Sequence, residues 1–236
     1  MTKIFSLFSA LLLCGFAARS QSFLPGVDMF SHKKTSYLTL ADGTKVEGEI
    51  DDIDRKKGLL KSVTINPAGG GKKKTYKAEA IQNMYLPPSG LDKAMKADDF
   101  LKDATQWQTV DLDKDILGRG YVYFEQVSVR ISKKKVQNLM MQLVNPSFSS
   151  KVKAYYDPLA DESVGIGIAG INVAGGLAKS YYLKKGNETA YLLRKKQYDD
   201  DFATLFGDCK ALITKVGKNP AWADLAKHVY EYAQCK

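Results

Sequence analysis

The first half of the chain alternates apolar and polar residues in the manner of a β-meander. Strands are predicted at 37–40, 46–50, 59–65 and 74–78, and residues 80–86 fit either a strand or a short helical turn. Asp42-Gly43, between the first two predicted strands, is typical of a tight hairpin. The glycine-rich stretch 67–71 predicts a looser turn before the fourth strand.

The second half predicts a larger sheet followed by helices. Strands that continue one sheet are expected at 120–131, 135–144, 151–156, 164–173, 179–183 and 188–193, after a connecting helix at 91–104. Residues 198–206 begin with three aspartates, which favour a helix amino terminus, and Gly207 is placed to end that helix. In the last predicted helix Asn219 is the cap and Pro220 the first residue. Its apolar stripe comprises Trp222, Leu225, Ala226, Val229, Tyr230 and Ala233.

These elements together predict an α+β fold that is dominated by antiparallel β-structure. Residues 21–90 are expected to form a small N-terminal β-meander or barrel. Residues 91–236 are expected to form a larger antiparallel sheet with the connecting helix and C-terminal helices. The stretch Pro87-Pro88-Ser89-Gly90 marks the expected boundary because such residues interrupt regular structure.

Residues 1–20 predict a signal peptide. The apolar run 4–18 follows Lys3 and is too short to span a bilayer, and small residues before Gln21 suit cleavage there. We therefore expect export to the periplasm or the medium, with no transmembrane segment after cleavage. Cleavage removes two basic residues and no acidic one, which lowers the net charge from +9 to +7. Lipidation of Cys14 is the competing reading, although Leu13 is larger than the residue that a lipobox places before its cysteine.

Two cysteines remain after the predicted cleavage, Cys209 and Cys235. An even pair in an oxidising compartment predicts one disulfide, which would close the C-terminal helices. Two buried free thiols are the alternative.

The spacing of Gly165, Gly167 and Gly170 matches that of a dinucleotide-binding loop. Such a loop must open into a helix, whereas residues 171–176 contain two glycines and two β-branched residues. We interpret the stretch as a glycine-rich strand and turn, and we expect no cofactor.

Other catalytic and metal patterns are weak. Asp111, Asp113 and Asp115 resemble the start of a calcium loop, but Ile116 stands where that loop requires glycine, and no metal is expected. Asp224 and His228 lie one helical turn apart, a spacing that is usual for surface contacts. Exported glycosidases use two carboxylates, but no motif here selects a pair, so the catalytic residues of any enzyme stay unknown.

Basic residues recur in clusters at predicted turns and strand ends. The clusters are 33–34, 55–57, 72–74, Lys133, Lys134 and Lys135, Lys184 and Lys185, and 194–196. Turn lysines usually keep loops soluble, but several clusters at one end of a sheet would form a surface for an anionic ligand. Tyr121 and Tyr123 alternate on one strand and would join this surface if they were exposed.

The stretch SYLTLADGTKVEGEIDDIDRKKGLLKSVTI at 36–65 resembles the first three strands of an Sm-like barrel. The shared features are the strand–Asp-Gly–strand start, Gly48 in the second strand and an acidic turn before Leu59. The resemblance implies a small curved barrel. It does not imply RNA binding, because the Met-Asn pair of that family and its Arg-Gly motif are missing.

A second resemblance spans most of the chain. FLPGVDMFSHKKTSY, MYLPPSG, NPSFSSK and SYYLKKGNE…LRKKQYDDDFATLFGDC are similar to exported proteins of unknown function from Bacteroidetes-type bacteria. This resemblance implies export and a Gram-negative envelope, and it assigns no functional residue.

We therefore expect a non-catalytic envelope or secreted protein that binds a protein, an anionic glycan or a membrane surface. Nucleic acid is not an expected partner outside the cytoplasm. An exported hydrolase acting on glycan or peptide is the alternative.

Overall fold

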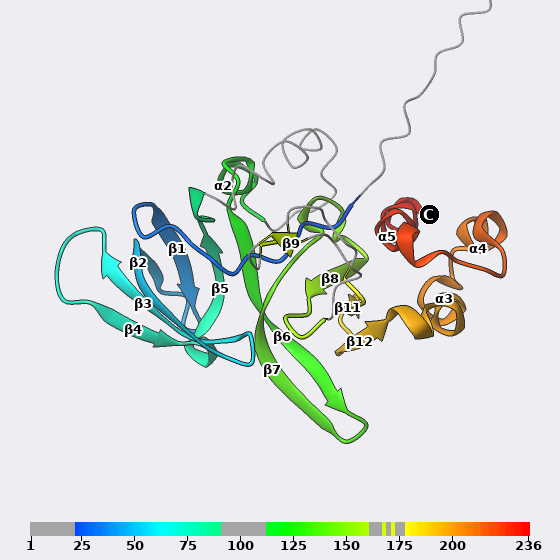
Figure 1. Ribbon diagram of the computed structural model, residues 1–236, viewed down its shortest axis with the longest axis horizontal. Helices are drawn as coiled ribbons and strands as arrows, with labels where there is room; N and C mark the ends of the chain where they lie inside the picture. The colour runs from blue at the N-terminus through cyan, green and yellow to red at the C-terminus, as the bar shows by residue number, and fades with distance from the viewer. Residues whose placement is uncertain (1–21, 91–111, 161–166, 169–170, 173–177) are drawn as a thin grey trace, which may run out of the picture.

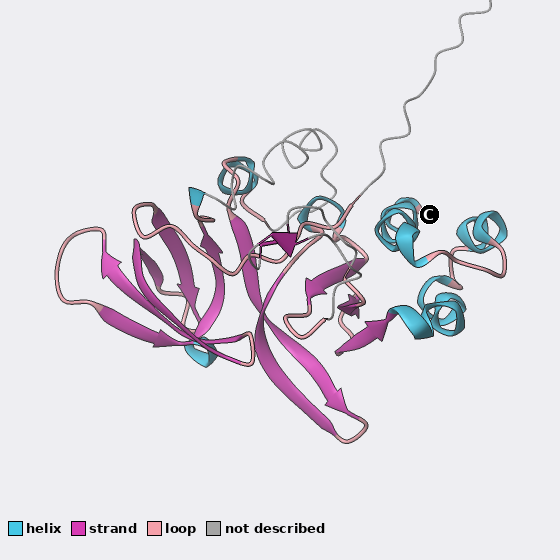
Figure 2. Ribbon diagram, in the orientation of Figure 1, coloured by secondary structure: helices cyan, strands magenta, loops and turns pink. Residues whose placement is uncertain are grey.

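The computed structural model describes residues 22–90, 112–160, 167–168, 171–172 and 178–236 (Figure 1). The predicted signal peptide, the helix predicted at 91–104 and most of the strand predicted at 164–173 lie outside these residues. The described residues form a mixed ten-stranded sheet with helices gathered near the C-terminus, which confirms the α+β prediction (Figure 2).

The ten strands of this sheet include every strand predicted in the first half of the chain. They are β1 Thr35–Leu40, β2 Lys45–Lys56, β3 Leu59–Pro67, β4 Lys74–Lys77, β5 Ile81–Leu86, β6 Val122–Ser132, β7 Lys135–Gln142, β8 Val152–Tyr156, β11 Ser180–Lys185 and β12 Ala190–Arg194. The order is β4-β3-β2-β1-β5-β6-β12-β11-β8, and β7 pairs with the other side of β6. All pairs are antiparallel except β12 with β6, which are parallel at Ala190 and Tyr191.

Strands β1–β5 curve around one buried apolar cluster (Figure 1). The predicted Asp42-Gly43 hairpin is present: Gly43 has φ +84°, and the Asp42 Oδ1 accepts a hydrogen bond from the Thr44 amide at 2.9 Å. Gly48 on β2 lies so close to β3 that a Cβ there would be 2.1 Å from the Asn66 carbonyl oxygen. Residues 80–86 resolve into a 3-10 turn, Ala78–Ala80, followed by β5.

The sheet is continuous across the domain boundary that the sequence predicts near residue 90. β5 pairs with β6 from Asn83–Glu125 to Leu86–Val122, and Val122, Phe124 and Met140 join the core of β1–β5. The division at residue 90 stays a prediction.

Three helices cover one face of β8, β11 and β12. They are α3 Tyr198–Phe206, α4 Lys210–Val216 and α5 Leu225–Gln234, and 3-10 turns at Lys195–Gln197 and Trp222–Asp224 precede α3 and α5. Tyr198, Phe202, Leu205 and Phe206 form one buried face of α3, as helical spacing requires. These side chains pack against Leu183 and other sheet residues in the largest apolar cluster of the described residues.

The C-terminal part departs from the sequence prediction in two ways. The last helix begins at Leu225, because residues 222–224 form a 3-10 turn and Asp224 takes the cap position, so the predicted start at Pro220 is wrong. Helix α4 was not predicted, since only Leu212 of its residues is fully buried and the apolar period is weak. Gly207 is the C-terminal cap of α3, as predicted. A side chain would not fit at this position, because a Cβ would be 2.4 Å from the Ala203 carbonyl oxygen.

The stretch predicted as one sheet strand at 164–173 is also different. Gly167–Ile168 (β9) and Ile171–Asn172 (β10) pair only with each other in a separate two-stranded ladder, because glycine-rich sequence weakens long strands. Residue 171 therefore continues in extended conformation and does not open a helix, while Gly165 and Gly170 lie outside the described residues.

The segment before β1 is held across the sheet by the side chain of Gln142 at the end of β7. The Gln142 Oε1 accepts a hydrogen bond from the Val27 amide at 2.9 Å, and its Nε2 donates to the Pro25 carbonyl at 2.9 Å. The Leu24 amide donates to the Val144 carbonyl at 2.7 Å. A Cβ at Gly26 would overlap the Tyr156 ring, so this segment lies flat on its neighbours.

Candidate functional site: a basic pocket beside the β6–β7 hairpin

The sheet face opposite the C-terminal helices carries a pocket. Ser180 pairs with Arg194 and Tyr182 pairs with Leu192 across β11 and β12, so these four side chains share one face of the sheet. Tyr181, one residue along, points to the other face and packs in the cluster under the helices. Helices close one side of the sheet, and the pocket lies on the other.

The pocket has a volume of about 740 Å³, which is within the range of small-molecule sites. Its described lining residues are Ile131, Asp157, Leu159, Lys179, Ser180, Tyr182, Leu192, Arg194, Lys195 and Lys196. They come from the end of β6, from the turn after β8 and from the β11–β12 hairpin with its flanking residues, three segments that are separated in sequence.

The apolar part of the lining is unusually exposed. Leu159 is 63% exposed and Ile131 is 44% exposed, and Leu192 and Tyr182 lie half-buried between them. Burial raises the pKa of the Tyr182 hydroxyl, and nearby Asp157 raises it further. The phenol therefore stays protonated and is available as a hydrogen-bond donor.

Four cations lie at one rim of this apolar floor. Lys179, Arg194, Lys195 and Lys196 are all exposed, and none takes part in an ion pair with another described residue. The Lys195 amide donates to the Lys179 carbonyl at 2.8 Å, which holds the two ends of the cluster together. A concentration of unpaired cations at one rim favours an anionic ligand.

A single buried carboxylate shapes the pocket wall. Asp157 is 3% exposed; its Oδ2 accepts a hydrogen bond from the Ser180 hydroxyl at 2.7 Å, and its Oδ1 accepts from the Leu159 amide at 3.0 Å. These bonds fix the turn after β8 and hold Leu159 at the pocket edge. The carboxylate therefore stabilises the turn, and every other charged residue of the described lining is a cation.

The β6–β7 hairpin ends next to this pocket. Every residue from 130 to 138 is exposed, and Lys133 and Lys134 form the turn between the strands. Lys133, Lys134 and Lys135, which the sequence analysis proposed for a partner surface, are therefore all at the surface. Ile131 belongs both to this hairpin and to the pocket.

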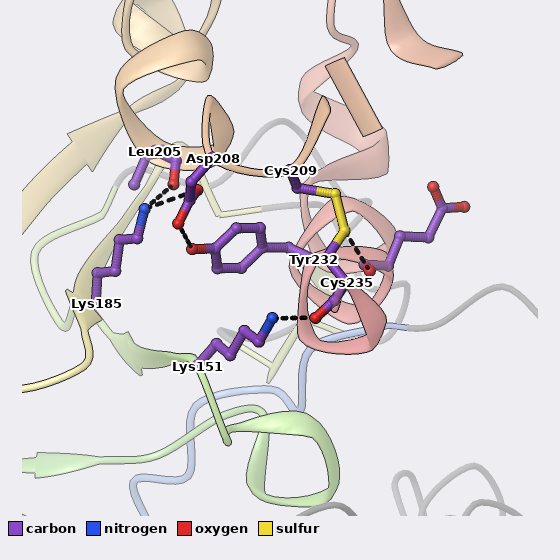
Figure 3. Close-up of a disulfide and its surroundings, with 8 residues drawn as sticks. Lys151, Lys185, Leu205, Asp208, Cys209, Tyr232 and Cys235 are labelled. Carbon is purple, nitrogen blue, oxygen red and sulfur yellow. Dashed lines mark hydrogen bonds and ion pairs between the residues drawn. A yellow bond between two sulfur atoms is a disulfide. The ribbon is translucent and has the colours of Figure 1, made fainter. Parts of the chain in front are cut away.

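Lys185, another residue proposed for the partner surface, takes part in a contact network beside the disulfide (Figure 3). Its Nζ donates to the Leu205 carbonyl and to the Asp208 Oδ1, both at 3.0 Å, and lies 5.0 Å from the centre of the Tyr232 ring. The hydroxyl of Tyr232 donates to the Asp208 Oδ2 at 2.6 Å. Lys185 thus ties β11 to the end of α3 and contacts α5 through the Tyr232 ring, and neighbouring Lys184 is half-buried.

Tyr121 and Tyr123 are 8% and 6% exposed, so their rings present little surface to a partner. Tyr123 contacts Tyr85, with ring centres 4.9 Å apart. The Tyr121 ring lies 5.9 Å from Tyr37 and 5.3 Å from the Arg119 guanidinium. Their packing against these neighbours is that of sheet and core residues.

The predicted disulfide between Cys209 and Cys235 is confirmed, with the two Cα atoms 6.0 Å apart (Figure 3). Cys209 precedes α4 and Cys235 follows α5, so the bond joins the two ends of the terminal helical hairpin. The Lys151 ammonium donates to the Cys235 carbonyl and ties the same end to the body.

The remaining sequence candidates have structural roles. Asp113 accepts a hydrogen bond from the Ile116 amide at 2.9 Å and caps the short helix α2 (Lys114–Gly118), while Asp111 lies outside the described residues. His228 is buried, bonds the Tyr198 hydroxyl through Nδ1 at 2.6 Å, and has a pKa lowered by that burial. No group of three or more metal-ligating side chains occurs in the described part of the chain.

Sequence reasoning missed a second polar cluster, on β6 and β8. The Glu125 carboxylate accepts hydrogen bonds from the Tyr155 hydroxyl and the Lys153 ammonium, each at 2.8 Å. Burial and Glu125 both raise the pKa of Tyr155, so its hydroxyl is a donor and not a nucleophile. The sequence carries no sign of the cluster, because β6 and β8 are not consecutive strands.

No helix among the described residues has the length and apolar character needed to cross a membrane. Comparison with protein-family models, with curated proteins and with solved structures finds no match for this chain.

Proposed function

We propose that this chain is an exported, non-catalytic envelope or secreted protein that binds an anionic partner through the pocket beside β12. The observation that carries the proposal is the set of four cations that form no ion pair with another described residue and lie beside an exposed aliphatic floor. The cations attract a carboxylate, phosphate or sulfate, and the Arg194 guanidinium matches the planar or forked geometry of such groups. Leu159, Ile131 and Leu192 then contact an apolar part of the same partner.

The alternative of an exported hydrolase has less support. A glycosidase needs two carboxylates on either side of the bond that is cleaved. Among the described lining residues there is one carboxylate, Asp157, and its two oxygens are occupied by Ser180 and the Leu159 amide. Turnover of peptidoglycan or of a protein substrate by the purified protein would favour the hydrolase.

The binding proposal is tested with three soluble anions that represent the candidate partners: a heparin fragment, polyglutamate and dodecanoate below its micelle concentration. Calorimetric titration compares the wild type with Arg194→Gln/Lys195→Gln/Lys196→Gln. We expect at least one anion to bind, with a loss of about tenfold or more in the variant, since one charge-assisted hydrogen bond contributes about 1.5 kcal/mol or more.

The matched control removes three charges elsewhere, with Lys72→Gln/Lys73→Gln/Lys74→Gln in the exposed segment that leads into β4, where Lys73 pairs with Asp51. Equal losses in the two triple variants would mean that only net charge matters, and the pocket proposal would be wrong. Absence of binding by the wild type to all three anions would also refute it.

Export is tested separately by the intact mass of protein recovered from the periplasm or medium. A mass that starts at Gln21 supports the proposed location, whereas a full-length protein in the cytosol would contradict it. The same sample treated with and without reductant reports the Cys209–Cys235 bond.

A further inference from the structure

The end of the β6–β7 hairpin extends beyond the rest of the sheet (Figure 1). β12 pairs with β6 only at Val129 and Arg130, so farther along β6 has only β7 as a neighbour. We call residues 130–136 the hairpin tip. All seven are exposed, although they lie in or between two paired strands.

The hairpin tip combines positive charge with aliphatic side chains. Its four cations are Arg130, Lys133, Lys134 and Lys135, and none is in an ion pair with another described residue. Ile131 is 44% exposed and Val136 is 48% exposed. Exposed aliphatic side chains have a hydration cost that an apolar partner surface would remove, and the neighbouring cations favour a partner that is also anionic.

The same combination continues into the pocket. Ile131 lines both features, and Leu159, at 63% exposure, lies on the pocket side. Three of the four large apolar side chains that are exposed in the described part of the chain therefore gather here; Met29 is the fourth. The four pocket cations add to the four of the hairpin tip.

We infer that the hairpin tip docks on a bilayer that contains anionic phospholipid. This inference rests on the proposed function and names its partner. The lysines contact lipid phosphates, and Ile131 and Val136 enter the boundary between headgroups and acyl chains. Long lysine stems let the charge stay at headgroup level while the aliphatic neighbours lie deeper.

Aliphatic rather than aromatic exposure distinguishes a lipid from a glycan partner. Sugar rings are recognised by stacking on exposed aromatic rings. Tyr121, just before β6, and Tyr123 on β6 are buried, whereas Ile131, Val136 and Leu159 are exposed. An amphiphilic anionic surface satisfies both the cations and these aliphatic groups.

The test is co-sedimentation with vesicles of phosphatidylcholine alone and of phosphatidylcholine with phosphatidylglycerol, at about 0.1 M salt. The protein is used as purified after export, and every variant carries the same amino terminus, so differences arise at the substituted positions. One variant is Lys133→Gln/Lys134→Gln/Lys135→Gln, another is Ile131→Ser/Val136→Ser, and Lys72→Gln/Lys73→Gln/Lys74→Gln is the control with the same charge.

We expect the wild type to bind the anionic vesicles and not the neutral ones, and to be released as salt rises. Each basic residue near an anionic membrane contributes roughly a fivefold change in affinity, so the triple tip variant should lose on the order of 100-fold. The Ile131/Val136 variant should weaken binding as well, whereas the control should stay within about threefold of the wild type.

The inference is wrong if the tip variants bind anionic vesicles as well as the control does, or if neutral and anionic vesicles bind equally. Pocket-dependent binding of a soluble anion without vesicle binding would overturn the membrane inference and leave the proposed function standing. Loss of both would overturn both. Circular dichroism spectra that match the wild type establish that each variant is folded.

Discussion

The disulfide between Cys209 and Cys235 allows a quantitative prediction, because its two ends are 26 residues apart. A cross-link stabilises chiefly by restricting the unfolded chain, and a loop of this length corresponds to about 3.5 kcal/mol at 25 °C in the chain-entropy model. For a chain of this size that free energy corresponds to a change in Tm of roughly 7–14 °C.

The folded state should survive loss of the bond. Lys185 still joins Leu205 and Asp208, the Tyr232 hydroxyl still reaches Asp208, and Lys151 still contacts the carbonyl of residue 235 (Figure 3). These contacts hold α5 without the covalent link. The reduced protein is therefore expected to be folded in dilute buffer and to unfold at lower denaturant.

Urea unfolding, followed by far-UV circular dichroism, measures the difference. Comparison of the wild type with and without dithiothreitol measures the effect of the disulfide on the free energy of unfolding without any change of residue. The variant Cys209→Ala/Cys235→Ala lacks the disulfide, so its free energy of unfolding should not change when reductant is added. The expected fall in the free energy of unfolding is about 3.5 kcal/mol. Mass spectrometry of the dithiothreitol-treated wild type should show both thiols free. If it does, and the free energies of unfolding of the reduced and oxidised wild type differ by less than about 1 kcal/mol, the loop-entropy argument does not apply to this protein.

Three further changes test the packing. Burial lowers the pKa of His228, so as pH falls the unfolded chain takes up a proton on this residue before the folded protein does. The free energy of unfolding should therefore fall as pH drops below about 6.5, and it should fall less in His228→Gln. Urea unfolding at a series of pH values measures both. Gly48→Ala places a Cβ against the Asn66 carbonyl and should cost about 1–3 kcal/mol in thermal unfolding. Gln142→Leu leaves the buried Val27 amide without its acceptor, costs about 1–3 kcal/mol and should speed proteolysis of the N-terminal segment.

The changes at Gly48 and Gln142 each have a matched control in the chain. Gly69→Ala adds a Cβ where no atom lies within 4 Å and should be nearly neutral. Gln137→Leu changes an exposed glutamine on the same strand as Gln142 and should leave proteolysis unchanged. A control that behaves like its test variant would contradict the corresponding contact argument.

Local elements were largely predictable from residues close in sequence. The Asp42-Gly43 hairpin, the helix 198–206 and the turn at Lys133 and Lys134 depend on backbone preferences and short-range patterns that act over a few residues. The start of α5 was placed too early because Asn219 and Pro220 are favourable start signals, and tertiary packing of Trp222 selected a 3-10 turn instead.

The candidate site was less predictable for a physical reason. The sequence identified 194–196 as basic but offered no means to bring it near Asp157 or Ile131, which are distant in the chain. The sequence also could not separate buried from exposed tyrosines, since Tyr121 and Tyr123 follow the same alternation that an exposed row would follow.

The sequence by itself therefore determined most strands of the sheet, helix α3, the cysteines that pair and the positions of the basic turns, because these depend on local propensity and on residue type. Only the tertiary structure decided that β12 runs parallel beside β6, that the helices cover one face of the sheet, and that Lys179 and Arg194 meet Leu159 on the other. Burial of the largest apolar cluster selects which strands become neighbours, and that selection depends on contacts between residues far apart in the chain.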